Sequence, residues 1–174
     1  MFEFESHGGM DKLEEMEEEL LGFLGFGSEH GKIKYDEACE KYGVDELDYD
    51  EEEAMSKELG TCTFLSHFPH RTHPFWNMKQ NDDDKNLYNK IDVIMHGQET
   101  IGSAERATNV DEMRENFHTI SDGEYADLLY KHFTKERVEK ELEEYLSHDF
   151  FPRFGGGIGV TRMVRAMEMS GLTK

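Results

Sequence analysis

Alternating apolar and polar residues mark the N-terminal part of the chain as a strand followed by a helix. Phe2 and Phe4 alternate with polar residues over residues 1–6, a pattern typical of a strand with one buried face. From Met10 to Leu24, leucines and methionines recur every three or four residues among acidic side chains, which predicts an amphipathic helix. The glycine pair at residues 8–9 separates the two elements.

Further along the chain, helical and strand-like patterns alternate after a loop expected at Gly25–Lys34. The segments with helical spacing are Tyr35–Tyr42, Glu51–Leu59, Asp111–Ile120, Thr161–Met169 and Ser121–Leu146, the last opening on a capping-box pattern. The segments with strand-like patterns are Thr61–His67, Phe75–Gln80, Leu87–Met95, Glu99–Arg106 and Phe150–Val160. Because most connections are short and of hairpin type, we expect an α+β fold in which helices flank an antiparallel β-sheet.

Composition limits the class of protein further. The 174 residues suit a single domain, 1–174, and carry a net charge of −20. This excess of acid argues against binding of nucleic acid through the chain's own surface, since lysine and arginine are what neutralise phosphates. The acidic stretches Glu14–Glu19 and Asp45–Glu53 are expected to be solvated.

The sequence points to a cytoplasmic protein that does not enter a membrane. No apolar run approaches the roughly 20 residues of a membrane span, and the N-terminus lacks the basic and apolar regions of a secretory signal. The two cysteines, Cys39 and Cys62, are too few for a disulfide framework, so we expect reduced thiols.

The strongest chemical signal is the glycine-rich segment from Phe151 to Arg162. Glycines let a backbone approach a flat or charged ligand closely, although a bulge or tight packing would also explain them. Arg162, in the first turn of the helix that follows, offers a planar guanidinium to a phosphate or an adenine ring. The segment is not a Walker A loop, because no Gly-Lys-Ser/Thr sequence follows it.

Two carboxylates, Asp92 and Glu99, fall on consecutive expected strands joined by a turn at His96 and Gly97. A hairpin of this kind can bring them together. Magnesium takes one or two carboxylates together with substrate phosphates, so the pair would suit Mg²⁺ bound to ATP. Exposed acids on a strand are the simpler alternative.

Small residues and an arginine follow Glu99 on the same expected strand. Such a strand, with Arg106 at its far end, can hold a carboxylate substrate in bidentate fashion, although a surface salt bridge is the alternative. Upstream, two prolines keep three histidines in Ser66–Lys79 from aligning on a helix as zinc ligands. Aromatic packing explains that region better and leaves Lys79 free for an anionic ligand.

Taken in order, three segments resemble the catalytic core of class II aminoacyl-tRNA synthetases. They are Pro74-Phe75-Trp76, Asp92 with Glu99–Arg106, and Gly155–Arg162. The resemblance is to the aspartyl/asparaginyl subgroup and its archaeal asparagine synthetase relatives, and it covers most of the chain. It implies an antiparallel sheet that binds ATP in a bent form and activates an amino acid as its adenylate, a ligase reaction of protein biosynthesis.

On the nucleotide side, the resemblance implies that Arg162 contacts ATP near the γ-phosphate and stacks by the adenine. Gly157 and Gly159 would leave room beside the nucleotide. Asp92 and Glu99 would hold magnesium and the phosphates. ATP and Mg²⁺ are therefore the expected cosubstrate and cofactor.

On the amino-acid side, the resemblance implies that Arg106 binds the α-carboxylate or the side chain of aspartate or asparagine. Ser103 would line that pocket, and Phe75 and Lys79 would lie on a strand next to it. The residues expected to act in catalysis are Arg162, Glu99 and Arg106.

The chain also departs from the family pattern. The family's first motif is not found, and residues 1–5 resemble the end of the second motif, beyond its ATP-binding arginine. The resemblance thus implies a core incomplete at its N-terminus, which would join a complementing N-terminal chain or form a homodimer, and reach tRNA through another chain. Transfer to tRNA, transfer to ammonia, and a non-catalytic paralogue that only binds ATP and amino acid all stay open.

Overall fold

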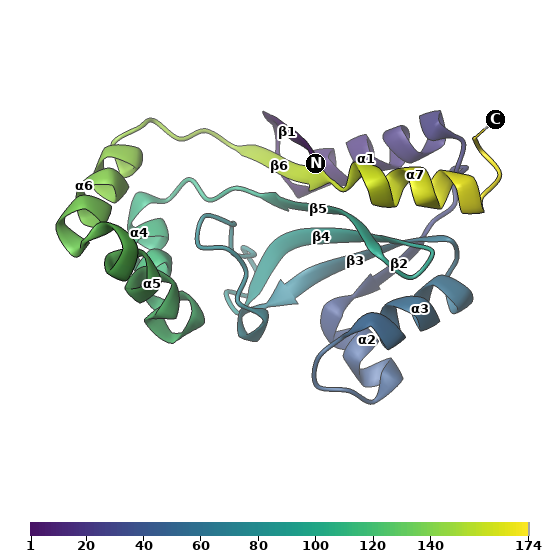
Figure 1. The fold of residues 1–174 in the computed structure, drawn as a ribbon, viewed down its shortest axis with the longest axis horizontal. Coiled ribbons are helices and arrows are strands. Elements are labelled where there is room, and N and C mark those ends of the chain that lie inside the picture. The colour runs from purple at the N-terminus through teal and green to yellow at the C-terminus, as the bar shows by residue number, and fades with distance from the viewer. Residues whose placement is uncertain (174) are drawn as a thin grey trace.

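A six-stranded sheet forms the centre of the computed structural model, which describes residues 1–173 (Figure 1). Its strands are β1 (Phe2–His7), β2 (Gly31–Lys34), β3 (Cys62–Pro69), β4 (Leu87–Met95), β5 (Glu99–Glu105) and β6 (Arg153–Ile158). In space they follow the order β1-β6-β5-β4-β3-β2. Every neighbouring pair is antiparallel except β2 and β3, which run parallel. The predicted α+β fold with a flanked, mostly antiparallel sheet is confirmed.

Helices cover the two faces of the sheet unequally. The helices that pack on it are α1 (Met10–Leu24), α2 (Tyr35–Tyr42), α3 (Tyr49–Glu58) and α7 (Val160–Met169). Leu13 and Leu21 of α1 and Met163 of α7 pack with β3–β6 side chains on one face. Met55 of α3 packs with Leu65 and the α2 side chains on the other. The second face is therefore covered only over β2, β3 and β4.

Three further helices, α4 (Val110–Thr119), α5 (Glu124–Phe133) and α6 (Lys135–Leu146), form a unit beyond one end of the sheet (Figure 1). Trp76 packs into its core against Phe117 and Tyr145. None of the helices described in residues 1–173 is long and apolar enough to cross a membrane.

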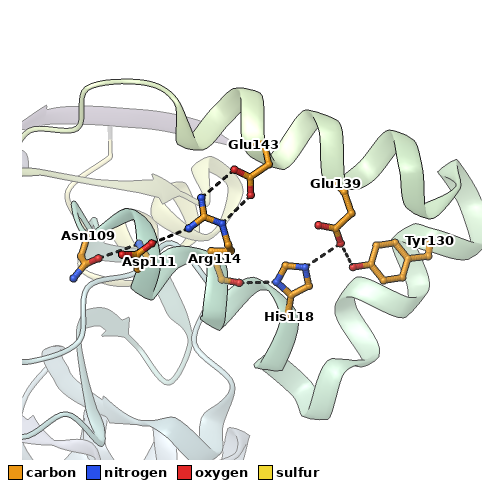
Figure 2. A network of polar contacts seen from close by, with 7 residues as sticks. All are labelled: Asn109, Asp111, Arg114, His118, Tyr130, Glu139 and Glu143. Carbon is orange, nitrogen blue, oxygen red and sulfur yellow. Dashed lines mark hydrogen bonds and ion pairs between the residues drawn. The ribbon is translucent and has the colours of Figure 1, made fainter.

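Polar contacts tie this three-helix unit together (Figure 2). Arg114 of α4 forms a two-pronged ion pair with Glu143 of α6, with nitrogen–oxygen distances of 2.8 and 3.0 Å. The two ring nitrogens of His118 lie 2.7 Å from the Arg114 carbonyl and 2.9 Å from the Glu139 carboxylate, which also accepts from the Tyr130 hydroxyl. Since both partners of the ring are acceptors, the doubly protonated imidazolium fits best.

We expect the contribution of His118 to stability to fall as pH rises. Burial lowers its pKa, but the hydrogen bonds to Glu139 and the Arg114 carbonyl and the charge of Glu139 raise it by more, so its folded-state pKa lies above 6.5. A group whose pKa is raised on folding stabilises the folded chain at pH values below its unfolded-state pKa. That stabilisation is lost as pH rises past its folded-state pKa. Urea unfolding of wild type and His118→Gln between pH 5.5 and 8.5 measures this. The two should differ by at most about 1 kcal/mol at low pH and converge at high pH. A difference that does not change with pH would contradict the assignment.

Two expected elements are wrong because their hydrogen bonds come from distant residues. The expected loop Gly25–Lys34 ends in strand β2, which exists only through its parallel pairing with β3. The expected strand Phe75–Gln80 is not a strand. Instead, Lys79 lies between the separating ends of β4 and β5, accepting from Asn89 and donating to the Glu105 carbonyl.

The expected helix Ser121–Leu146 is also wrong in detail. Thr134, with φ 67° and ψ 145°, breaks it into α5 and α6. Ser121 has a left-handed backbone with φ 51°, and α5 starts after Gly123 with no side-chain capping bond, so the expected capping box does not form. The acidic stretches are not wholly solvated either, since Glu17 is fully buried.

Candidate functional site

The uncovered half of the α3 face of the sheet holds the predicted site residues. Because strand side chains alternate between faces, the cross-strand register Asp92–Gly102–Gly157–Glu3 places one residue of each of β4, β5, β6 and β1 on this face. Two of the four are glycines. The floor of this half-face is therefore backbone rather than side chain.

The glycines here make room for carboxylates from neighbouring strands. A Cβ at Gly102 would lie 2.5 Å from Glu99 Oε1, and one at Gly155 would collide with the Glu5 carboxylate and lie 2.7 Å from the Phe4 carbonyl. Real Cβ atoms do not approach so closely, so alanine at either position would displace the carboxylate above it. The glycines thus let acidic side chains lie flat across the sheet.

Two adjoining cavities lie on this floor. The first, of 390 Å³, is lined by Met1, Glu3, Phe4, Glu5, Met78, Gly102, Ser103, Arg106 and Gly155–Gly157. The second, of 300 Å³, is lined by Met1, Glu99, Thr100, Gly102, Gly157 and Gly159–Arg162. They share Met1, Gly102 and Gly157, so together they form one groove with Arg106 in one half and Arg162 in the other.

Arg162 lines the second half of the groove. Helix α7 begins at Val160, directly after the glycine strand, and this places Arg162 in its first turn as predicted. The Arg162 side chain is exposed, and its Nη1 donates to the carbonyl oxygen of Glu99 at 2.6 Å. The guanidinium is thus held over the start of β5 with donors still available to a ligand.

Asp92 and Glu99 converge above Gly102, within 3.4 Å and 2.5 Å of the position that a Cβ there would occupy. Asp92 is 7% exposed, its Oδ2 is hydrogen-bonded to Lys90, and its Oδ1 has no hydrogen-bond partner. Burial, together with the charge of Glu99, raises the pKa of Asp92 to about 6 against the opposing effect of Lys90. A buried carboxylate oxygen without a partner is a suitable ligand for a hard cation.

This pair supplies two ligands for a magnesium ion, whose remaining positions waters or substrate phosphates would fill. Within residues 1–173, no group of three or more His, Cys, Asp or Glu side chains is arranged to hold a metal ion. That is the usual situation for Mg²⁺, which keeps several waters and takes the rest of its ligands from substrate phosphates.

The other half of the groove contains a cluster of two arginines and one glutamate. Glu5 Oε1 lies 3.1 Å from Arg153 Nε and 3.6 Å from Arg106 Nε. Arg153 also donates to the Tyr145 hydroxyl at 3.4 Å, while its Nη1 is buried without a partner. Among the residues that line this half of the groove, Arg106 is the cationic side chain beside Glu3 and Glu5, and its guanidinium suits an anionic group of a substrate.

The other three predicted substrate residues lie less centrally. Ser103 lines the first cavity, but its hydroxyl donates to the Ile91 carbonyl and is buried on the α1 side of the sheet. Lys79 lines neither cavity, and its ammonium pairs with Glu105 and Asp82. Phe75 also lies outside both and packs against Trp76 and Tyr125.

Comparison with known families decides what kind of core this is. The sequence profile of the class II tRNA synthetases (D, K and N) matches residues 6–171. The chain belongs to this family. No curated protein sequence matches it.

Solved structures of class II synthetases share its fold. Asparaginyl-tRNA synthetase from Pyrococcus horikoshii, complexed with asparaginyl-adenylate, matches with a TM-score of 0.73 at 19% identity, over 94% of this chain and 43% of that chain. Aspartyl-tRNA synthetase from Entamoeba histolytica matches with a TM-score of 0.68 at 20% identity, over 94% of this chain and 39% of that chain. This class II chain therefore spans less than half the length of these synthetases.

Four residues at the candidate site were not predicted from the sequence. They are Glu5, Lys90, Arg153 and Glu52. The alternation of Phe2 and Phe4 with acids does place Glu5 on the opposite face from the two rings, so its position was readable. Glu52 gave no such signal, because it lies inside a run of acids on a helix from another part of the chain.

Proposed function

We propose that this class II chain uses ATP to activate aspartate or asparagine as the aminoacyl-adenylate, which then passes to tRNA or to ammonia. The observation that carries the proposal is the groove itself. Arg162, the Asp92–Glu99 pair and Arg106 follow one another along a floor of glycine backbone. That order matches the order of charges in ATP and an amino-acid carboxylate placed end to end.

In this arrangement, Arg162 binds the phosphates near the γ position, and Gly157 and Gly159 leave room for the nucleotide. Asp92 and Glu99 hold Mg²⁺, which when bound neutralises phosphate charge. Magnesium is thus a proposed cofactor held by this chain's own carboxylates.

Arg106 orients the amino acid so that its carboxylate oxygen attacks the α-phosphorus of ATP. The bond from that phosphorus to the bridging oxygen breaks, and pyrophosphate leaves. Every reacting group is anionic, so the chain contributes positioning and positive charge rather than a nucleophilic side chain. The Arg106 guanidinium, which lines that half of the groove, supports binding of a carboxylate there.

The relatives support the same substrates. The synthetases of similar fold from Pyrococcus horikoshii and Entamoeba histolytica are complexed with asparaginyl-adenylate. We propose ATP and a small amino acid as the ligands of this chain, tRNA as a ligand reached through another chain, and a homodimer or a complementing N-terminal chain as its assembly. The cytoplasm is the proposed compartment.

A direct test is binding of non-hydrolysable sulfamoyl analogues of aspartyl- and asparaginyl-adenylate, followed by calorimetry. We expect one of them to bind more tightly than ATP and to compete with it, since it fills both halves of the groove. A seryl analogue serves as control and should bind no better than ATP. Equal binding of all three would contradict amino-acid recognition.

Glu99→Gln is expected to reduce the magnesium dependence of ATP binding. Loss of one of two carboxylates near the cation should raise the Mg²⁺ concentration needed for half-maximal ATP binding about tenfold or more. Titrating Mg²⁺ at fixed ATP measures the shift. Identical titration curves for variant and wild type would remove Glu99 from the metal site.

A further inference from the structure

Helix α3 holds the hairpin that carries Glu99. The Glu52 carboxylate accepts a hydrogen bond from the backbone nitrogen of Glu99 at 3.2 Å. One turn later on the same helix, the Ser56 hydroxyl accepts from the nitrogen of Gly97 at 2.7 Å. The β4–β5 ladder shifts register between Val93 and Ile94, beside Glu99, so α3 supports the sheet where its own pairing is irregular.

The hollow above Gly102 contains a buried carboxylate oxygen without a partner. Asp92 is more than nine-tenths buried, and its Oδ1 points with Glu99 Oε1 into the space above Gly102. This unpartnered oxygen is the point at which a bound cation would be stabilised most.

Charge in this hollow is unbalanced. Three carboxylates face two cationic side chains, since Lys90 pairs with Asp92 and Arg162 donates to the Glu99 carbonyl. Glu52 is partly buried, and its carboxylate contacts the backbone of Glu99.

We infer that Glu52 is a positioning residue of the cation site: it holds the backbone of Glu99 and adds a third negative charge around a divalent cation bound by Asp92 and Glu99. It acts from outside the coordination sphere, in agreement with the lack of a three-ligand cluster in residues 1–173. The inference rests on the proposed function in that Asp92 and Glu99 are taken as the metal-binding pair. It also ties α3, which lies outside the glycine floor, to nucleotide chemistry.

The test is a titration of the full chain with Mn²⁺ alone, in which electron paramagnetic resonance counts the free ion. Glu52→Gln keeps an oxygen that can accept from Glu99 and removes only the charge, whereas Glu52→Ala removes both. Asp50→Asn is the matched control, because it removes one charge from an exposed position of the same helical turn. Circular dichroism checks that each variant folds.

We expect Glu52→Gln to weaken Mn²⁺ binding about tenfold, Glu52→Ala at least as much, and Asp50→Asn less than twofold. The inference is overturned, while the Asp92–Glu99 pair stands, if wild type binds Mn²⁺ and Asp92→Asn weakens that binding but Glu52→Gln does not. The inference is also overturned if Glu52→Ala weakens Mn²⁺ binding and Glu52→Gln does not, because the hydrogen bond to Glu99 rather than the charge would then matter. If wild type does not bind Mn²⁺ at all, both the inference and the metal site of the proposed function fail.

Discussion

Replacing Arg162 with alanine is expected to weaken ATP binding about 10- to 100-fold. Arg162 offers its guanidinium to the second half of the groove, which Gly157 and Gly159 also line. A hydrogen bond between charged partners contributes about 1.5–3 kcal/mol, which sets the size of the effect. Calorimetric titration with ATP and Mg²⁺ measures it.

Arg165→Ala is the matched control for Arg162→Ala. Arg165 lies on the next turn of α7 and, like Arg162, donates to a carbonyl of the β4–β5 hairpin, in its case that of His96. It does not line either cavity of the groove. If both variants lose affinity equally, the loss comes from a loosened hairpin. If neither loses any, Arg162 does not bind the nucleotide.

Replacing Glu17 with leucine is expected to stabilise the fold by about 2–4 kcal/mol at pH 9. Glu17 is fully buried under the sheet, and neither carboxyl oxygen has a hydrogen-bond partner. Burial raises its pKa from 4.5 to about 8, and the neighbouring Ser103 hydroxyl, which donates to Ile91, offsets this only in part. The apolar side chains around it, including Leu13 and Leu21, would accept a leucine.

The effect of Glu17→Leu should depend on pH with a definite sign. An acid whose pKa is raised on folding keeps its proton in the folded chain, so the free energy of unfolding falls as pH rises from 4.5 to about 8. The advantage of the leucine variant should therefore be several-fold larger at pH 9 than at pH 5 in urea unfolding. Glu19→Leu, at an exposed position of the same helix, should show no such change. Equal stabilities of wild type and Glu17→Leu at pH 9 would show that the carboxyl finds a partner.

Local patterns predicted the elements that depend on local interactions. The helix Met10–Leu24 has the expected bounds because its apolar spacing matches one face, and the segment Leu87–Met95 forms β4 because nearly all of its side chains are buried. The glycine strand followed by Arg162 was likewise readable. Strand β2 was not, since four residues form a strand only when β3 is beside them.

The site was predictable where the chemistry is carried by the strands themselves. Asp92, Glu99 and Arg106 lie on one face because β4 and β5 are adjacent, which the hairpin pattern already indicated. Glu52 contacts the backbone of Glu99 from a helix more than forty residues upstream, through packing that no periodicity encodes. Lys79 was expected next to the substrate, but a buried glutamate that pairs with it cannot be read from the sequence.

The central claim is tested most directly by exchange of labelled pyrophosphate into ATP, with Mg²⁺ and each of the twenty amino acids in turn. Exchange requires the enzyme to form an adenylate and reverse the step, so it reports activation without regard to the final acceptor. The account predicts exchange with aspartate or asparagine and with no other amino acid, and its loss in Arg162→Ala. Absence of exchange with all twenty would contradict activation by this chain, and ATP binding without exchange would identify a site that binds and does not react.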